Sequence, residues 1–314
     1  EWLLDTDEVA ITKKGETMKT NEYIEKVASD LIEAMKTAGT NFMLPWVKDG
    51  MPKNLGRLKT KDPYYYGINT FVLWYEKDRQ GFKSNIWGTE KQIKDAGGKV
   101  KDEHQRKATQ VVLWKPFTYK DKYKKDTGDH KKGDTRIVSS VNMRFFWVYN
   151  LDQTTLEKQE EKLEGAKERP NVETYIKNTG AKVEHGGDRC FYVPSKDFIK
   201  MVHKDKFKKT GDSSATENYY STFLHELTHW TGHESRLKRK MDDYFGTAGY
   251  AFEELVAEMG AAMQCAILGV TSKPKKESAQ YLNSWIKGLK DNPKAIMSAV
   301  GKAGSAVKYL ENLQ

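Results

Sequence analysis

Residues 221–237 read STFLHELTHWTGHESRL and carry two histidines four residues apart, His225 and His229, with Glu226 directly after the first. In an α-helix, residues four apart lie on one face, so both imidazoles can reach a single metal ion. Glu226 is rotated by about 100° from His225 on such a helix. It can therefore reach a water on the ion without binding the ion itself. The pattern predicts a metal site with Glu226 as its general base.

A catalytic zinc ion needs a third protein ligand and an open position. His233 is the nearest candidate, but on an unbroken helix it lies two turns, about 12 Å, beyond the first histidine. The segment YAFEELVAEMGAAMQCAI, residues 250–267, predicts a second helix that carries three glutamates. We expect Glu254 to be the ligand and Glu258, on the same face, to hold a histidine ring from behind. The alternates for the ligand are Glu258 and Glu253.

An ordinary helix with surface carboxylates and partly buried histidines is the competing interpretation, because a five-residue pattern has many chance matches. Two features favour the metal site. Phe223, Leu224 and Leu227 place apolar side chains where a zinc-site helix would be buried, and a glutamate-rich helix follows. We expect one divalent ion. Zn²⁺ is the default for two histidines and one carboxylate, and Mn²⁺ is the alternative.

The positive charge of the chain is concentrated in one region. The formal net charge is +9, but residues 36–150 carry 24 basic and 12 acidic side chains, a net of +12. The same region holds 18 of the 36 aromatic residues. Proteins that bind single strands pair a positive groove with aromatic platforms for the bases. Residues 36–150 have the composition of such a single-strand-binding region.

The candidate DNA contacts are the basic and aromatic side chains that lie close together in that region. They are Lys53, Arg57, Lys59, Lys61, Tyr64, Tyr65, Tyr66, Trp87 and Arg144. The competing interpretation places the aromatic residues in the core and makes the lysine-rich segment 120–132 an ordinary solvated loop. In this competing interpretation Phe71, Trp74, Phe145 and Trp147 belong to the core.

The order of the expected elements predicts an α+β fold. A mixed α/β nucleic-acid-binding domain is expected over 20–153, and a mostly helical domain over 171–314. The polar run that ends at Pro170 predicts a linker over 154–170. Residues 1–19 are expected to be a poorly ordered leader, with Met18 as a candidate start of a shorter form. Within the domains, the patterns predict a helix over 21–39 and strands over 109–117 and 136–151.

The composition also bears on the cellular compartment. No apolar run reaches about 18 residues, so no membrane span and no membrane partner are expected. The two cysteines, Cys190 and Cys265, have no metal-binding spacing and predict no disulfide framework. A reducing, cytoplasmic location fits both observations.

Several long motifs resemble one known family. YYSTFLHELTHWTGHESRL (219–237) followed by YAFEELVAEMGAA (250–262) resembles the C-terminal zincin-like metallopeptidase domain of ArdC-type antirestriction proteins. The N-terminal half resembles the same family in PWVKDGMPKNL, YYYGINTFVLW, WGTEKQIKDAGGKV and RFFWVYNLDQT. The segment SWIKGLKDNPKAIMSAVGKAGSAVKYL resembles the end of the family's domain. The resemblance spans roughly residues 20–310.

The resemblance implies a single-stranded-DNA-binding domain followed by a gluzincin-type metal site, in a protein of mobile elements that counters host restriction. The implied ligands are His225, His229 and a glutamate of the EELVAE segment, and the implied base is Glu226. Such a protein would be a zinc-dependent metallopeptidase whose partner besides DNA is a protein substrate or a restriction enzyme. Two alternatives stay open: a protective DNA-binding module with a non-catalytic metal site, and a DNA-dependent protease that acts on DNA-bound proteins.

Overall fold

The computed structural model describes residues 9–11, 17–39, 50–122, 131–156, 171–210, 213–241, 247–270 and 281–314. The first half contains β1 (Val9–Ile11), β2 (Thr17–Lys19), α1 (Thr20–Ala38), β3 (Lys53–Asn54), α3 (Ile68–Gln80), β4 (Ile86–Gly88), α4 (Glu90–Asp95), β5 (Thr109–Lys122) and β6 (Thr135–Asn150). The second half contains α6 (Val172–Asn178), β7 (Lys182–His185), β8 (Phe191–Val193), β9 (Phe198–Met201), α7 (Ala215–Trp230), α8 (Ala248–Leu268), α9 (Leu282–Asp291) and α10 (Ala295–Glu311). The expected α+β class is confirmed.

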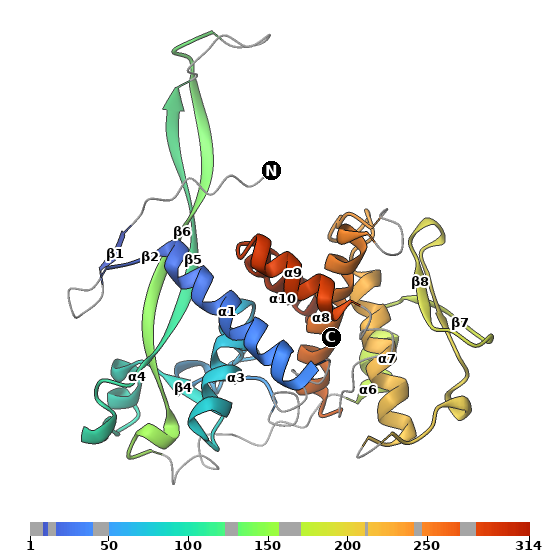
Figure 1. Cartoon of the computed structure of the whole chain (residues 1–314), viewed down its shortest axis with the longest axis horizontal. Coiled ribbons are helices and arrows are strands. Elements are labelled where there is room, and N and C mark those ends of the chain that lie inside the picture. Colours follow the sequence, from blue (N-terminus) through green and yellow to red (C-terminus); the bar gives the residue numbers. More distant parts are fainter. Residues whose placement is uncertain are drawn as a thin grey trace.

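A four-stranded sheet with the order β3-β4-β6-β5 organises the first half. β5 and β6 are antiparallel over their whole length, from the pair Thr109 and Val148 to the pair Lys122 and Thr135. Their outer part projects beyond the helices as a two-stranded ribbon (Figure 1). Helices α1 and α3 lie beside the inner part of this ribbon. The expected helix over 21–39 and the expected strands over 109–117 and 136–151 are thereby confirmed.

Helices dominate the second half, as expected. α7 and α8 pack against each other, and α10 packs on α8. A three-stranded sheet with the order β7-β9-β8 lies beside α7. β9 is central, parallel to β7 and antiparallel to β8. The metal-site pattern thus lies on a helix that has a sheet on one side and a second helix on another.

The predicted leader and linker fall largely on residues that the structure leaves undescribed. In the leader, residues 1–8 and 12–16 lie outside the described residues, while 9–11 and 17–19 pair as the antiparallel strands β1 and β2. In the linker, residues 157–170 lie outside them too. Leu156, however, is buried with Leu151 in a small apolar cluster of the first half. The packed part of the first half therefore extends at least three residues beyond 153.

The two halves share one hydrophobic core. α1 packs against α9 and α10 (Figure 1), and one buried cluster contains Met35 of α1 together with Leu289 of α9 and Ile296 of α10. α10 also approaches the start of α3 closely, since a Cβ on Gly304 would lie 3.1 Å from the backbone nitrogen of Gly67. The described residues of the two predicted domains therefore share buried contacts.

Among the described residues, no helix has the length and apolar character needed to cross a membrane.

Candidate metal centre

Helix α7 begins at a capping box. The Ser214 hydroxyl accepts a hydrogen bond from the backbone N–H of Glu217, and the Glu217 carboxylate accepts one from the backbone N–H of Ser214. This satisfies donors that a helix start otherwise leaves unpaired. The helix then carries His225, Glu226 and His229 into the interior, where they are 2%, 2% and 8% exposed. Polar groups buried this deeply need partners.

Helix α8 crosses α7 at very short range because it has a glycine at the contact. A Cβ added to Gly260 would lie 2.6 Å from Cγ2 of Thr228, which no relaxed packing allows. The side-chain amide of Gln264 donates to Oγ1 of Thr228, at 2.8 Å, and to the carbonyl oxygen of Leu224. This crossing carries the three glutamates of α8 up to the histidines of α7.

Three side chains present ligand atoms to one point. The Nε2 atoms of His225 and His229 are 3.2 Å apart, and the two carboxylate oxygens of Glu254 each lie 3.5 Å from one of these nitrogens. Two donors bound ~2.0–2.1 Å from one tetrahedral ion lie about 3.3–3.4 Å apart. The spacing of these three residues therefore fits a tetrahedral ion with one position left open.

The donor chemistry also fits a cation. Two imidazole nitrogens that face each other at 3.2 Å, with a carboxylate beside both, form a concentration of lone pairs. Such an arrangement is stable only with a proton or a metal ion between the donors. A set of two histidines and one carboxylate is a donor set that divalent zinc and manganese accept.

The two other glutamates of α8 lie behind the histidine rings. An oxygen of Glu253 lies 3.2 Å from Nδ1 of His229, and an oxygen of Glu258 lies 3.6 Å from Nδ1 of His225. The Glu253 carboxylate is within hydrogen-bond distance of the His229 ring and so keeps its opposite nitrogen available as a ligand, whereas Glu258 lies just beyond hydrogen-bond distance of His225. The structure thus separates the three glutamates: Glu254 faces the ligand point, and its two neighbours face the outer ring nitrogens.

Arg239 fixes the position of Glu253. Its guanidinium donates to Oε1 of Glu253 at 2.8 Å, to the Thr231 hydroxyl at 2.8 Å and to the Thr228 carbonyl at 2.6 Å. The arginine side chain is only 3% exposed. It therefore ties the end of α7 to α8 through a carboxylate that itself contacts His229.

The electrostatics of the cluster are those of a site built for positive charge. Burial alone would lower the pKa of His229, but hydrogen bonds and charges from Glu253 and Glu254 outweigh it and raise that pKa to about 10. Burial likewise works to raise the pKa of Glu254, but the two histidines hold it far below its usual range. Without an ion, a proton on His229 neutralises part of the carboxylate charge, so metal binding has to displace it.

The remaining residues of the pattern take separate positions. Glu226 is buried next to His225 on α7. His233 follows the end of the helix, with Nδ1 2.7 Å from the Ser235 hydroxyl and 4.0 Å from a carboxylate oxygen of Asp197. Within the described part of the chain, His233 is absent from the group of converging ligand atoms.

The structure divides the candidate DNA contacts. Lys59, Lys61 and Arg144 are exposed. The partly buried candidates are Lys53, Arg57, Tyr64 and Tyr66. Arg57 donates to the Tyr64 carbonyl, and the Tyr66 ring lies 4.7 Å from the Lys308 ammonium.

Two of these candidates are corrected. Tyr65 is 7% exposed and Trp87 is fully buried, and both lie in one apolar cluster with Leu73. A buried ring has no free face for a base, so neither can serve as a stacking platform in this structure. Trp147, which the competing interpretation places in the core, is 37% exposed.

Sequence reasoning missed Arg239 and Gly260. Arg239 stands in the basic run RLKRK, where nothing marks it out from its neighbours. Gly260 is a glycine in the middle of a strong helix pattern, which usually has a packing reason. The glycine therefore indicated that another element packs closely against this helix. No signal in the sequence distinguishes Trp147 from the adjacent aromatic residues.

Profiles of two protein domains match this chain. The N-terminal domain of anti-restriction factor ArdC matches residues 21–150, and the zincin-like metallopeptidase domain matches residues 170–302. The metal-free crystal structure of the antirestriction ArdC protein from plasmid R388 superposes with a TM-score of 0.69 at 28% identity, over 92% of this chain and 97% of that one. The Mn(II)-bound structure of the same protein gives 0.65 over the same shares.

Curated relatives cover nearly all of this chain. Protein y4eC of Sinorhizobium fredii (strain NBRC 101917 / NGR234) is 29% identical over 302 residues, which are 93% of this chain and 92% of that protein. Two DNA primase TraC proteins of Escherichia coli are 34% and 33% identical over 90% and 95% of this chain. The chain spans only 26% and 20% of the length of these two primases.

Proposed function

Because this chain belongs to the ArdC-type antirestriction proteins, we propose that it binds single-stranded DNA and hydrolyses peptide bonds at a divalent-metal site. The DNA is bound by the basic first half and the peptide by the zincin-like second half. The protein acts on behalf of a mobile element whose incoming strand it protects from host restriction. The observation that carries the peptidase part is the convergence of His225, His229 and Glu254 on one point.

These three residues would hold the ion, and Glu253 and Glu258 would hold the histidine rings. Zn²⁺ is the ion we assign, with Mn²⁺ as the alternative, since the related R388 protein has a Mn(II)-bound structure. A bound ion of this kind supplies Lewis-acid polarisation of the scissile carbonyl. The buried surroundings of the cluster exclude bulk water, which strengthens every electrostatic interaction there.

Glu226 is the proton carrier in this proposal. It takes a proton from the attacking water as general base and returns it to the leaving amine as general acid. Its position on α7, one residue from a ligand but rotated away from the ligand face, supports this division of roles. With a bound ion to supply Lewis acidity and Glu226 to carry the proton, the site would meet the requirements for amide hydrolysis.

The DNA part of the proposal is supported by the net charge of +12 on residues 36–150 and by the exposure of Lys59, Lys61 and Arg144. Each phosphate contact releases counterions, so affinity is expected to fall steeply with salt. Duplex DNA should bind less well, because its bases are not free to stack. The two halves share a core, so binding should be measured on the full chain.

One set of variants tests the proposal. His229→Ala should lose nearly all bound metal by elemental analysis, while His233→Ala should keep it, since His233 lies outside the cluster. Glu226→Gln should keep both metal and single-stranded DNA but lose cleavage of casein or of the chain itself, assayed with and without DNA. Stoichiometric metal in His229→Ala would refute the site. Loss of metal in Glu226→Gln would refute the division between ligand and base.

The same variants separate the alternatives in a cell-based restriction-protection assay. Full protection by Glu226→Gln would assign protection to DNA binding alone. Lost protection, with folding and DNA binding intact, would make proteolysis part of the mechanism. Cleavage that requires DNA would point to a protease of DNA-bound proteins.

A further inference from the structure

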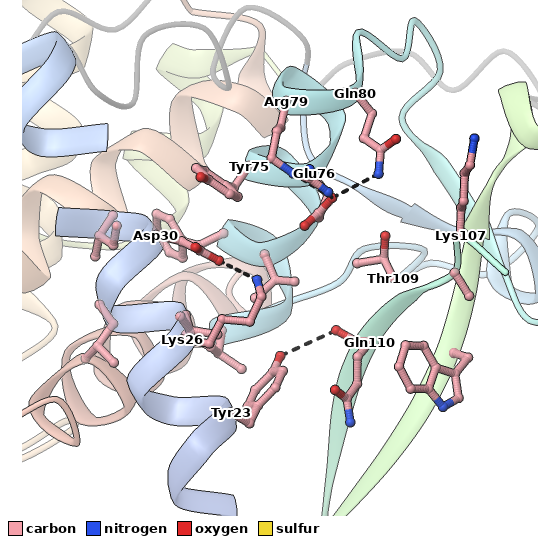
Figure 2. A pocket seen from close by; sticks show the side chains of 18 residues that line it. Tyr23, Lys26, Asp30, Tyr75, Glu76, Arg79, Gln80, Lys107, Thr109 and Gln110 are labelled. Atoms are coloured by element: carbon pink, nitrogen blue, oxygen red, sulfur yellow. Dashed lines mark hydrogen bonds and ion pairs between the residues drawn. The ribbon is translucent and has the colours of Figure 1, made fainter. Parts of the chain in front are cut away.

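A pocket of about 320 Å³ opens between α1, α3 and the inner part of the β5–β6 ribbon. Figure 2 shows side chains of three parts of the chain around one space. They are Tyr23, Lys26 and Asp30 from α1, Tyr75, Glu76, Arg79 and Gln80 from α3, and Thr109 and Gln110 from β5 with Lys107 just before it. The volume lies at the lower end of the range for small-ligand sites, about 300–1,000 Å³. The metal cluster contributes no residue to it.

The floor of the pocket combines an aromatic face with an amide. Gln110 and Trp147 are directly paired across β5 and β6, so their side chains lie on the same face of the sheet. Trp147 is 37% exposed although it lines the pocket. A large aromatic ring left open beside a concave surface is what base stacking requires.

Gln110 has an unmet hydrogen-bonding need. Gln110 is only 8% exposed, and its side-chain nitrogen Nε2 has no hydrogen-bond partner among the described residues. Leaving a buried donor unpaired is costly, so such a group usually has an acceptor in the functional state. Gln110 lines the pocket, so a rotation of its side-chain amide toward a ligand carbonyl or ring nitrogen held there would supply that acceptor.

The charges at the mouth favour an anionic ligand. The carboxylate of Asp30 is neutralised by Lys26 at 2.6 Å, and that of Glu76 by Arg79 at 2.6 Å. Lys107, which is exposed, has no carboxylate partner in the described part of the chain. One positive charge is thus left over beside an apolar, aromatic cavity.

We propose that this pocket takes one unstacked nucleobase of a bound single strand. The base stacks on Trp147, Gln110 donates to an acceptor on its edge, and Lys107 contacts the adjacent phosphate. The assignment rests on the proposed DNA-binding function and adds to it a defined position for a base. A base can enter the pocket only when it is unpaired and unstacked, so the pocket also accounts for a preference for single strands over duplex.

The test compares substitutions on the two faces of the β5–β6 ribbon. Trp147 and Gln110 lie on the face that lines the pocket, and Phe146 lies on the other face. Trp147→Leu keeps an apolar side chain but removes the stacking face, and Gln110→Leu removes the donor at similar size. Phe146→Leu is the matched control, because Phe146 is 40% exposed on the same strand, points to the opposite face and does not line the pocket. Each full-length variant is titrated with a thymidine decamer and with an abasic strand of equal length, after thermal unfolding has verified folding.

Trp147→Leu should weaken binding of the thymidine strand by about 5- to 150-fold, the value of one stacked base. Gln110→Leu should weaken it less. Neither should change binding of the abasic strand, and Phe146→Leu should change neither. Equal losses for both strands, or an equal loss in the Phe146 control, would overturn the pocket assignment.

A second measurement needs no variant. A single strand with 5-iodouracil should photocross-link the wild-type protein at a peptide that contains Trp147, Tyr75 or Tyr23. Cross-links confined to other peptides would refute the pocket while leaving DNA binding intact, whereas no binding of any strand would refute the proposed function itself. Thymidine monophosphate is added as a competitor at the same concentration of nucleotides as the strand. If it abolishes the cross-link, the pocket binds free nucleotides, and the assignment to a bound strand is overturned.

Discussion

We expect Arg239, a buried side chain, to affect the candidate metal site without touching it. It contacts Glu253, which contacts His229, and it also binds the end of α7. Arg239→Lys keeps the charge but loses the planar fork that makes these contacts at once. We expect metal affinity to fall about 10- to 100-fold, as for other partners of metal-bound histidines. Titration with a competing chelator measures this, with Lys240→Ala at an exposed neighbouring position as control.

An unchanged affinity in Arg239→Lys would mean that Glu253 holds its place without the arginine. Comparison with Glu253→Gln separates the two steps, because that variant removes the carboxylate that His229 contacts directly.

Asp197 gives a pH dependence away from the metal. Its carboxylate accepts hydrogen bonds from Arg236 and, at 2.7 Å, from the Tyr192 hydroxyl. The Arg236 hydrogen bonds lower the pKa of Asp197 despite the opposing effect of burial. A carboxyl whose pKa is lower in the folded than in the unfolded state stabilises the fold at pH values above its unfolded pKa of about 3.9. This stabilisation is lost as the pH falls through the pKa of the folded state.

Asp197→Asn should therefore be less stable than wild type at pH 7, with a difference that shrinks below about pH 4. Asparagine is suitable because residue 197 has a positive φ of 48°, which it tolerates. Urea unfolding at several pH values measures the difference. Asp205→Asn is the control, since Asp205 is exposed with no ion-pair partner in the described chain. A difference that stays constant down to pH 3 would contradict the assignment.

The pair of helices α7 and α8 depends on the absence of a side chain at one position. In Gly260→Ala the new Cβ would meet Thr228 at 2.6 Å, so the helices must separate. We expect a loss of about 1–3 kcal/mol in the free energy of unfolding, the usual penalty for overpacking. Metal affinity should fall as well, because Glu254 moves away from the histidines. Thermal unfolding and chelator competition measure the two effects.

Gly301→Ala is the matched control within α10, where nothing lies within 4 Å of the added Cβ. It should be neutral or stabilising by up to about 1 kcal/mol, since alanine favours helix interiors. Adding Thr228→Ala to Gly260→Ala should recover part of the loss because it removes the clashing atoms. Additive losses in that double variant would show that the helices do not repack at this contact.

The shared core joins the candidate metal site to the first half of the molecule. Met35 of α1 and Ile296 of α10 belong to the buried cluster that also contains Met259 of α8. Metal at about 100 times its dissociation constant should add about 2.7 kcal/mol to the free energy of unfolding. Because one core links both halves, we expect the metal to slow hydrogen exchange in α1 and α3 as well as in α7 and α8.

Hydrogen exchange followed by mass spectrometry, with and without Zn²⁺, measures this coupling. His229→Ala is the control, because we expect this variant to bind almost no metal and therefore to show no change on adding Zn²⁺. Protection confined to α7 and α8 would show that the two halves unfold independently.

The sequence by itself determined the features that depend on local geometry. The pairing of His225 with His229 follows from helix periodicity, and the composition of residues 36–150 marks the region proposed to bind DNA. The sequence favoured Glu254 and kept Glu258 and Glu253 as alternates. Only the tertiary structure decided which carboxylate faces the histidines, because that depends on the crossing of α7 and α8 at Gly260. It also decided that Trp87 is buried while Trp147 is open, since burial depends on which distant elements cover a strand. The shared core was also decided by the tertiary structure. The apolar face of α1 predicts that some element packs on it, and only the structure shows that these elements are α9 and α10.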